Sequence, residues 1–144
     1  MKVFIAGIMQ GSKKGKGIQE QDYRARIREA IKLRFPEVEV LDPFSLFPDS
    51  VEYDDRRAKQ VLFDMAAEAA SSDVLIAYLP EASMGSALEM IRAYDNGKTV
   101  YCITPMEKNW FINSVSTRNF VDLDDFVTWL QQTQLEDLID PGVD

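Results

Sequence analysis

The 144-residue chain contains no histidine and only one cysteine, Cys102. The absence of histidine excludes the commonest general base, the usual zinc ligand and any serine–histidine or cysteine–histidine catalytic pair. A single cysteine cannot form an internal disulfide bond or a thiolate metal cluster. We therefore expect no metal site and no cofactor, and any chemistry has to use carboxylates, hydroxyls, amides, lysine or arginine.

Long apolar runs are also missing. No stretch approaches the roughly 20 apolar residues that cross a bilayer, and the apolar N-terminal segment is too short for a signal peptide. The apolar fraction of 46% is ordinary for a globular chain. We expect one cytoplasmic domain over residues 1–144 that has no membrane partner.

Basic residues are absent between Asn119 and Asp144, a segment that carries seven acidic residues. This segment accounts for most of the net charge of −8, and we expect an acidic C-terminal helix and tail from about residue 122. Residues 13–34, by contrast, hold eight lysines and arginines against three acids. The acidic end argues against a nucleic-acid partner, whereas the basic segment permits a small anionic ligand.

Apolar, β-branched runs alternate with segments of helical periodicity, a pattern typical of parallel α/β sheets. The predicted strands cover residues 2–6, 37–41, 73–79, 99–104 and 120–121. The predicted helices cover residues 19–34, 53–71, 86–96, 109–116 and a segment from about 123, with a loop at 43–52. This order predicts an α/β fold with a doubly wound five-stranded parallel sheet in a three-layer αβα sandwich. Such sheets bind ligands beyond the carboxyl ends of their strands.

The segment Asp73–Glu89 combines a buried strand, a short loop of small residues and a helix start. Backbone N–H groups at a helix start can bind an anion, and Ser83 or Ser86 can add a hydroxyl. We place Glu89 in the first turn, where the helix dipole favours the ionised carboxylate. Such a carboxylate at the end of a strand can act as a nucleophile or a base.

The spacing Ser86-x-x-Glu89 also fits a capping box, in which the glutamate only returns a hydrogen bond to the Ser86 backbone. Spacing alone favours this capping role over catalysis. However, the apolar stripe of Leu88, Ile91 and Tyr94 leaves Glu89 off the predicted core face. A capping role would therefore not prevent access to a cleft.

The loop Gly7–Gly17 follows the first strand and carries four glycines and three lysines. It fits neither the Walker A pattern nor Gly-x-Gly-x-x-Gly. We expect residues 13–17 to be a solvated loop. Residues 7–12 are the better candidates for close backbone approach to a ligand.

Three segments resemble the nucleoside 2-deoxyribosyltransferase superfamily, which includes the 2′-deoxynucleoside 5′-monophosphate N-glycosidases. They are Phe4-Ile-Ala-Gly7, Asp73-Val-Leu-Ile-Ala and Gly85-Ser-Ala-Leu-Glu89-Met-Ile-Arg-Ala-x-x-x-Gly97-Lys-x-Val100. The resemblance spans most of residues 2–118. It implies a flavodoxin-like fold in which Glu89 attacks the anomeric carbon of a (deoxy)ribosyl group and releases the base. Water or a second base then resolves the glycosyl-enzyme, as in retaining glycosidases.

The resemblance also implies a branch of this superfamily. Transferases that act on free nucleosides usually carry an acid six residues before the nucleophile, whereas the nucleotide hydrolases carry serine, as Ser83 does here. The family further brings an asparagine or serine from a neighbouring subunit to the same end of the sugar, and Asn113 or Ser114 matches it. Both matches imply a 5′-monophosphate substrate and a homodimer with a shared active site.

Two positions depart from the family pattern. Phe4 stands where the family usually has a tyrosine that hydrogen-bonds to the nucleophile, and Asp64, the expected acid near the base, lies nine instead of eight residues before Asp73. The expected catalytic residues are Glu89 and Asp64. The expected substrate-binding residues are Phe4, Gly7, Ile8, Met9, Gln10, Gly11, Ser83, Gly85, Asn113 and Ser114.

Several alternatives compete with a nucleotide N-glycosidase. A deoxyribosyltransferase could act on free nucleosides, and Phe4 motivates a non-catalytic nucleotide-binding module. A phosphoribohydrolase of the Pro-Gly-Gly-x-Gly-Thr-x-x-Glu type fits less well, because residues 80–89 keep only part of that signature. A phospho-receiver domain is disfavoured, because the first strand ends in Ala6-Gly7 without a phosphorylatable aspartate.

Overall fold

The computed structural model describes residues 1–8, 22–47, 49 and 52–141. Within these residues the chain forms a five-stranded sheet in the order β2-β1-β3-β4-β5, and every strand pair is parallel. This order is that of flavodoxin-like doubly wound sheets, so the predicted sheet is confirmed. The strands are β1 (Lys2–Gly7), β2 (Glu39–Leu41), β3 (Val74–Tyr78), β4 (Thr99–Ile103) and β5 (Arg118–Phe120).

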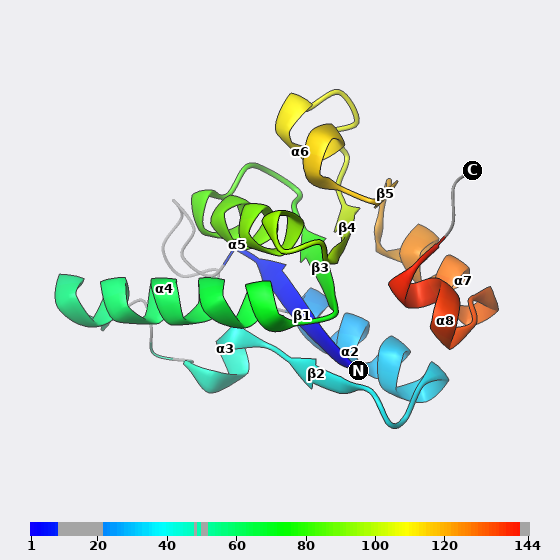
Figure 1. Ribbon diagram of the computed structural model, residues 1–144, viewed down its shortest axis with the longest axis horizontal. Coiled ribbons are helices and arrows are strands. Elements are labelled where there is room, and N and C mark those ends of the chain that lie inside the picture. The colour runs from blue at the N-terminus through cyan, green and yellow to red at the C-terminus, as the bar shows by residue number, and fades with distance from the viewer. Residues whose placement is uncertain (9–21, 48, 50–51, 142–144) are drawn as a thin grey trace.

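Helices cover both faces of the sheet and complete the predicted three-layer sandwich (Figure 1). One face packs against α2 and α7, and the other packs against α4 and α5, which lie side by side. The helices are α2 (Asp22–Arg34), α3 (Pro43–Leu46), α4 (Asp55–Ser71), α5 (Met84–Asp95), α6 (Trp110–Val115), α7 (Leu123–Gln132) and α8 (Leu135–Ile139).

The central strands alternate their side chains between two apolar clusters. In β1, Val3 and Ile5 face the cluster under α2 and α7, whereas Phe4 and Ala6 face the cluster under α4 and α5. The same alternation in β3 and β4 places Cys102 in the second cluster, where it is fully buried. Because both faces are covered, the buried residues of these strands form continuous apolar runs.

Capping side chains explain why some helix boundaries differ from the prediction. Residues 43–46 form α3 instead of a loop, because Asp42 Oδ1 accepts a hydrogen bond from the Phe44 N–H at 3.0 Å and Pro43 occupies the first turn. Helix α5 begins at Met84 instead of Ser86, since Ser83 is its N-cap. The strand β2 and the helix α4 each begin two residues later than predicted, and α8 is a helix that was not predicted. The predicted start of the first helix, at residue 19, lies outside the described residues.

A buried ion pair fixes the carboxyl end of β1. Arg24 of α2 donates to Asp42 Oδ1 at 2.7 Å, and the two side chains are only 2% and 4% exposed. The same guanidinium donates to the carbonyl oxygens of Ile5 at 3.4 Å and Gly7 at 3.2 Å. Arg24 therefore joins α2 to the last residues of β1 and to the end of β2.

Among the helices that the structure describes, none has the length and apolar character of a membrane span.

Tyr23 occupies the space in which a side chain at Gly7 would lie. A Cβ added to Gly7 would be 1.9 Å from the Tyr23 hydroxyl oxygen, and Tyr23 is itself buried and stacked on Tyr78 with ring centroids 4.4 Å apart. We expect Gly7→Ala to lower the free energy of unfolding by about 1–3 kcal/mol, because the buried ring has to shift. Urea unfolding followed by circular dichroism measures this change.

Gly85→Ala is the matched control, because a Cβ at this helical position meets no atom within 4 Å. We expect it to leave stability unchanged or raise it by up to about 1 kcal/mol, since alanine favours the helix over glycine. Equal stability of Gly7→Ala and the unmodified chain would contradict the packing described here.

Candidate active site

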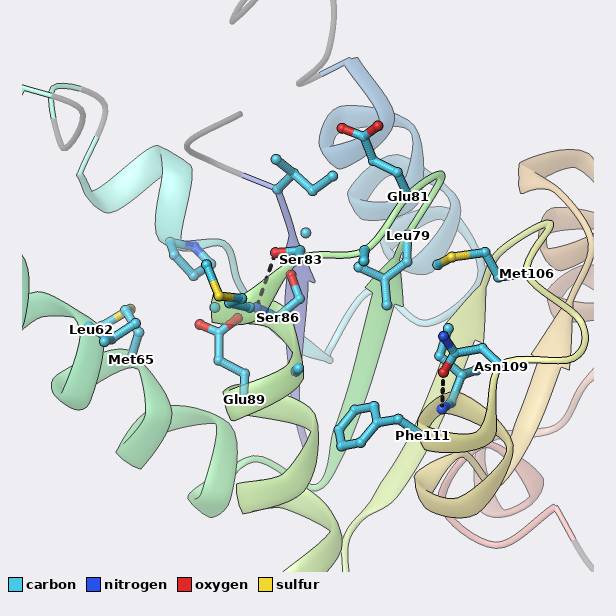
Figure 2. A pocket seen from close by; sticks show the side chains of 18 of the residues that line it. Leu62, Met65, Leu79, Glu81, Ser83, Ser86, Glu89, Met106, Asn109 and Phe111 are labelled. Atoms are coloured by element: carbon cyan, nitrogen blue, oxygen red, sulfur yellow. Dashed lines mark hydrogen bonds between the residues drawn. The ribbon is translucent and has the colours of Figure 1, made fainter. Parts of the chain in front are cut away.

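A cavity of about 620 Å³ opens beside the carboxyl ends of β1 and β3. In Figure 2, Leu62 and Met65 of α4 approach it from one side, and Asn109 and Phe111 approach it from the other. The start of α5 and the loop before it lie between these walls. The cavity is lined by Gly7, Ile8, Pro43, Tyr53, Ala58, Val61, Leu62, Met65, Leu79, Glu81, Ala82, Ser83, Met84, Gly85, Ser86, Ala87, Glu89, Met106, Asn109, Phe111 and Ile112.

Glu89 lines this cavity from the second turn of α5. Because Ser83 caps the helix, Glu89 is its sixth residue, beyond the first turn in which the prediction placed it. The predicted capping box is therefore wrong: the Ser83 hydroxyl accepts the Ser86 N–H at 3.3 Å, and Ser86 is not the cap. The carboxylate is thus not engaged in capping α5, and it points toward the end of the helix that carries Ser83 and Ser86 (Figure 2).

The buried face of α5 also differs from the predicted apolar stripe. It consists of Ser86, Glu89, Met90 and Ala93, whereas Tyr94, which the prediction placed on the core face, is 51% exposed. Glu89 is only 9% exposed. The buried face of the helix thus carries a serine and a carboxyl group beside two apolar residues that pack into the core.

Burial controls the ionisation of Glu89. Removal from water raises its pKa from 4.5 to about 8, because the charged form loses hydration, and the positive charge of Arg24 opposes this shift. In the described part of the chain the carboxylate accepts no hydrogen bond that would stabilise its charge. The predicted effect of the helix dipole on Glu89 assumed a position in the first turn, whereas the structure places this residue in the second turn and buries it.

Two serines precede Glu89 along α5 and differ in their hydrogen bonding. The hydroxyl of Ser83 is used by the helix cap. The hydroxyl of Ser86 is buried and has no hydrogen-bond partner among the described residues, although Ser86 lines the cavity. Ser83 and Gly85 line the cavity as well.

The structure brings together part of the predicted substrate-binding set. Gly7 and Ile8 line the cavity with Ser83, Gly85 and Glu89. The predicted contacts Met9, Gln10 and Gly11 lie outside the described residues. Phe4 is fully buried in the apolar cluster under α4 and α5 and does not line the cavity.

Three predicted residues lie away from this cavity. Asp64 is exposed on α4, whose buried side carries Met65 instead, so the structure does not bring Asp64 to Glu89. Asn113 and Ser114 are exposed on α6 and do not line this chain's own cavity. Asn113 donates to the Glu107 carbonyl at 2.9 Å, and Ser114 donates to the Trp110 carbonyl at 2.6 Å.

Three features of the site were not predicted from the sequence. The Arg24–Asp42 pair is one, because an arginine within a basic segment gives no signal of burial. The apolar wall of α4, with Val61 and Leu62, is another. Glu81 is the third; it follows Pro80 in the loop after β3, at the predicted ligand-binding edge, and could have been proposed from that position.

No group of three or more cysteine, aspartate and glutamate side chains within the described ranges could hold a metal ion. The described residues that line the cavity offer two carboxyl groups, Glu81 and Glu89, together with serine and tyrosine hydroxyls, an asparagine amide, backbone N–H groups and apolar walls. This set can bind a polar ligand with an apolar part and present one buried carboxyl group to it.

Comparisons with known proteins identify the fold. The chain matches no family model and no curated protein in sequence. In structure it is similar to a 2-deoxyribosyltransferase from Bacillus psychrosaccharolyticus, with a TM-score of 0.71, 15% identity and 96% coverage of each chain. It is also similar to a conserved protein from Enterococcus faecalis, with a TM-score of 0.65, 18% identity and coverage of 91% of this chain and 97% of that one.

A third similar structure is the CMP N-glycosidase from Clostridium botulinum. Its TM-score is 0.54 at 18% identity, and the match covers 92% of this chain and 98% of that one. The flavodoxin-like sandwich described here is therefore the fold of a 2-deoxyribosyltransferase and of an N-glycosidase.

Proposed function

We propose that the chain is a cytoplasmic enzyme of the nucleoside 2-deoxyribosyltransferase superfamily, a single domain that cleaves the N-glycosidic bond of a (deoxy)nucleoside 5′-monophosphate. The observation that carries this proposal is the buried carboxyl group of Glu89, which faces a cavity and is not engaged in capping its helix. The sequence resemblance around Glu89 and the shared fold of an N-glycosidase and a transferase support the same assignment.

In the proposed reaction the ionised Glu89 carboxylate attacks the anomeric carbon on the face opposite the base. A bond forms between the carboxylate oxygen and this carbon, the bond to the base nitrogen breaks, and the base leaves with the electron pair and takes up a proton. Water or a second base then attacks the same carbon and frees Glu89. This sequence needs neither histidine nor a metal ion.

The walls of the cavity suit the two ends of such a substrate. Leu62 and Met65 of α4 and Phe111 of α6 present apolar surface that can pack against a planar base. Between these walls lie Ser83, Gly85 and the first N–H groups of α5, which favour an anion such as a phosphate. An acid in place of Ser83 would repel that phosphate.

The function is tested by incubating the protein with 5′-monophosphates of the common ribo- and 2′-deoxyribonucleosides and with the free nucleosides. We expect free base from at least one monophosphate, and Glu89→Gln should lower its release by about a thousandfold or more, because the nucleophile is lost. Liquid chromatography of the released base measures both rates.

Asp95→Asn, an exposed change on the same helix, is the control and should leave the rate unchanged. Base release by Glu89→Gln at the unmodified rate would overturn the proposal. Faster cleavage of free nucleosides than of monophosphates would favour a nucleoside deoxyribosyltransferase, and tight binding of nucleotides that stay intact would favour a non-catalytic binding module.

The raised pKa of Glu89 predicts the pH dependence of the reaction. Because the nucleophile has to be ionised and its pKa is about 8, kcat/KM should rise with pH below 8 and level off above it. The increase should approach about tenfold per pH unit well below the pKa. A rate profile that is flat between pH 6 and 9 would contradict the proposed role of Glu89.

Unfolding experiments provide an independent control for the same group. The folded-state pKa of Glu89 lies above its value of 4.5 in water, so its contribution to stability is fully present below about pH 4.5 and is lost as the pH rises to about 8. Between these two pH values the unmodified protein loses a proton from Glu89 when it unfolds, whereas Glu89→Gln has no carboxyl group at this position to lose one. Its stability relative to the unmodified protein should therefore improve from pH 4.5 to 8 and change little above that range.

We also propose a homodimer whose subunits share their active sites. Asn113 and Ser114 are exposed outside their own cavity, so they would contact substrate only in a neighbouring subunit. A double variant, Asn113→Ala with Ser114→Ala, should lose activity, as Glu89→Gln does. The two inactive proteins are then unfolded and refolded together in equal amounts. Half of the dimers should be hybrids, and each hybrid has one site with both Glu89 and the Asn113–Ser114 pair intact, so about a quarter of all sites should be active.

Refolding each inactive protein alone is the control and should restore nothing. A protein that is monomeric at assay concentration, or a mixture that stays inactive, would contradict the shared site.

A further inference from the structure

Ser86 has a buried hydroxyl whose hydrogen-bonding capacity is unused in the described structure. The residue is 1% exposed, its hydroxyl makes no hydrogen bond there, and it lines the cavity. Buried polar groups are nearly always paired, so a buried hydroxyl without a partner calls for an explanation. Alanine at this position would avoid the unpaired group and would favour the helix.

The position of Ser86 relative to Glu89 suggests what its partner is. Ser83, Ser86 and Glu89 are three residues apart, and residues at this spacing lie along the same side of a helix. With a rise of about 1.5 Å per residue, Ser86 lies about 4.5 Å along the axis of α5 from Glu89. All three residues line the cavity and lie along α5 in Figure 2.

The chemistry of the proposed reaction determines which part of the substrate meets this side of α5. A carboxylate that displaces the base from the anomeric carbon approaches the sugar from the face opposite the base. In a β-D-ribofuranosyl group the 2′- and 3′-hydroxyls project from that same face, on the two ring carbons that follow the anomeric carbon. A hydroxyl beside the nucleophile is therefore well placed to meet one of them.

We propose that the Ser86 hydroxyl is the hydrogen-bond partner of a secondary hydroxyl of the sugar, on the ring face that Glu89 attacks. This inference rests on the proposed function and deepens it, because it makes Ser86 a determinant of the sugar specificity. A serine hydroxyl can both donate and accept, as a sugar hydroxyl can, so the pair satisfies both groups when the substrate is bound. The 2′- and 3′-hydroxyls share this chemistry, and the experiment distinguishes them.

The test measures binding, so that it does not depend on turnover. Glu89→Gln is the background, and the dissociation constants of a ribonucleoside 5′-monophosphate and of its 2′-deoxy and 3′-deoxy forms are measured by calorimetry. The series is run for the adenine, guanine, cytosine and uracil nucleotides. Adding Ser86→Ala should weaken binding about three- to tenfold for nucleotides that carry the partner hydroxyl and leave the affinity for the form that lacks it unchanged.

Ser116→Ala is the matched control, because its hydroxyl is also buried without a partner in the described structure but lies outside the cavity. It should weaken the binding of none of the three nucleotides. Ser86→Ala should also leave the melting temperature unchanged or raise it, because it removes no hydrogen bond within the described chain.

Four results would overturn the inference. Two of them concern the effect of Ser86→Ala on affinity: an equal loss of affinity for all three sugars, or no loss for any of them. The third is a loss of affinity that disappears with free nucleosides, which would assign Ser86 to the phosphate. The fourth is that no nucleotide binds. Failure of the proposed function is a separate observation, namely that the unmodified protein binds these nucleotides but releases no base.

Discussion

The buried ion pair between Arg24 and Asp42 is the interaction on which the site depends most. Its two side chains come from α2 and from the residue after β2, and the guanidinium also holds the carbonyl oxygens of Ile5 and Gly7. Asp42 in turn caps α3 by accepting from the Phe44 N–H at 3.0 Å. Removing one member of such a pair leaves an uncompensated buried charge, which typically costs about 3–5 kcal/mol. The pair therefore fixes the edge of the sheet at which the cavity opens.

The same pair determines the electrostatic surroundings of Glu89. Arg24 is the charge that opposes the rise in the Glu89 pKa, and the same guanidinium is paired with the Asp42 carboxylate at 2.7 Å. Burial therefore dominates, and the carboxyl group holds its proton at neutral pH. Such a group is a weak base and a weak nucleophile until it ionises, and its exclusion from water makes the ionised form more reactive. In the proposed reaction only a small fraction of Glu89 is ionised at neutral pH, but the carboxylate of that fraction is reactive.

Much of the fold could be predicted, because the spacing of apolar residues along the chain determines the strands and helices. The details of the site depend on where each helix begins and how it is rotated, which this spacing does not determine. The continuous apolar strands around Ile5 and Ile76 specified a doubly covered parallel sheet, and the residue order specified its helices. The start of α5 was ambiguous, since Ser83 and Ser86 are both good capping residues, and only the backbone conformation at Ser83 selects between them. That three-residue difference moved Glu89 from the first turn to the second. Asp64, which the family resemblance implied, lies on the exposed side of α4, because the rotation of this helix is set by the packing of Met65 and its neighbours.

Phe4 shows how the site differs from the pattern that the sequence resemblance implies. It lies in the apolar cluster with Met90 and carries no hydroxyl, so β1 gives Glu89 no hydrogen bond at that position. Ser83 and Ser86, at the start of the helix that also carries Glu89, bring hydroxyl groups to the cavity instead. A nucleophile and its neighbouring hydroxyls on one helix keep a fixed spacing, because the helix backbone is rigid over two turns. The geometry that would recognise a sugar and attack its anomeric carbon is then set by local structure, and the rest of the fold has only to place α5 against the cavity.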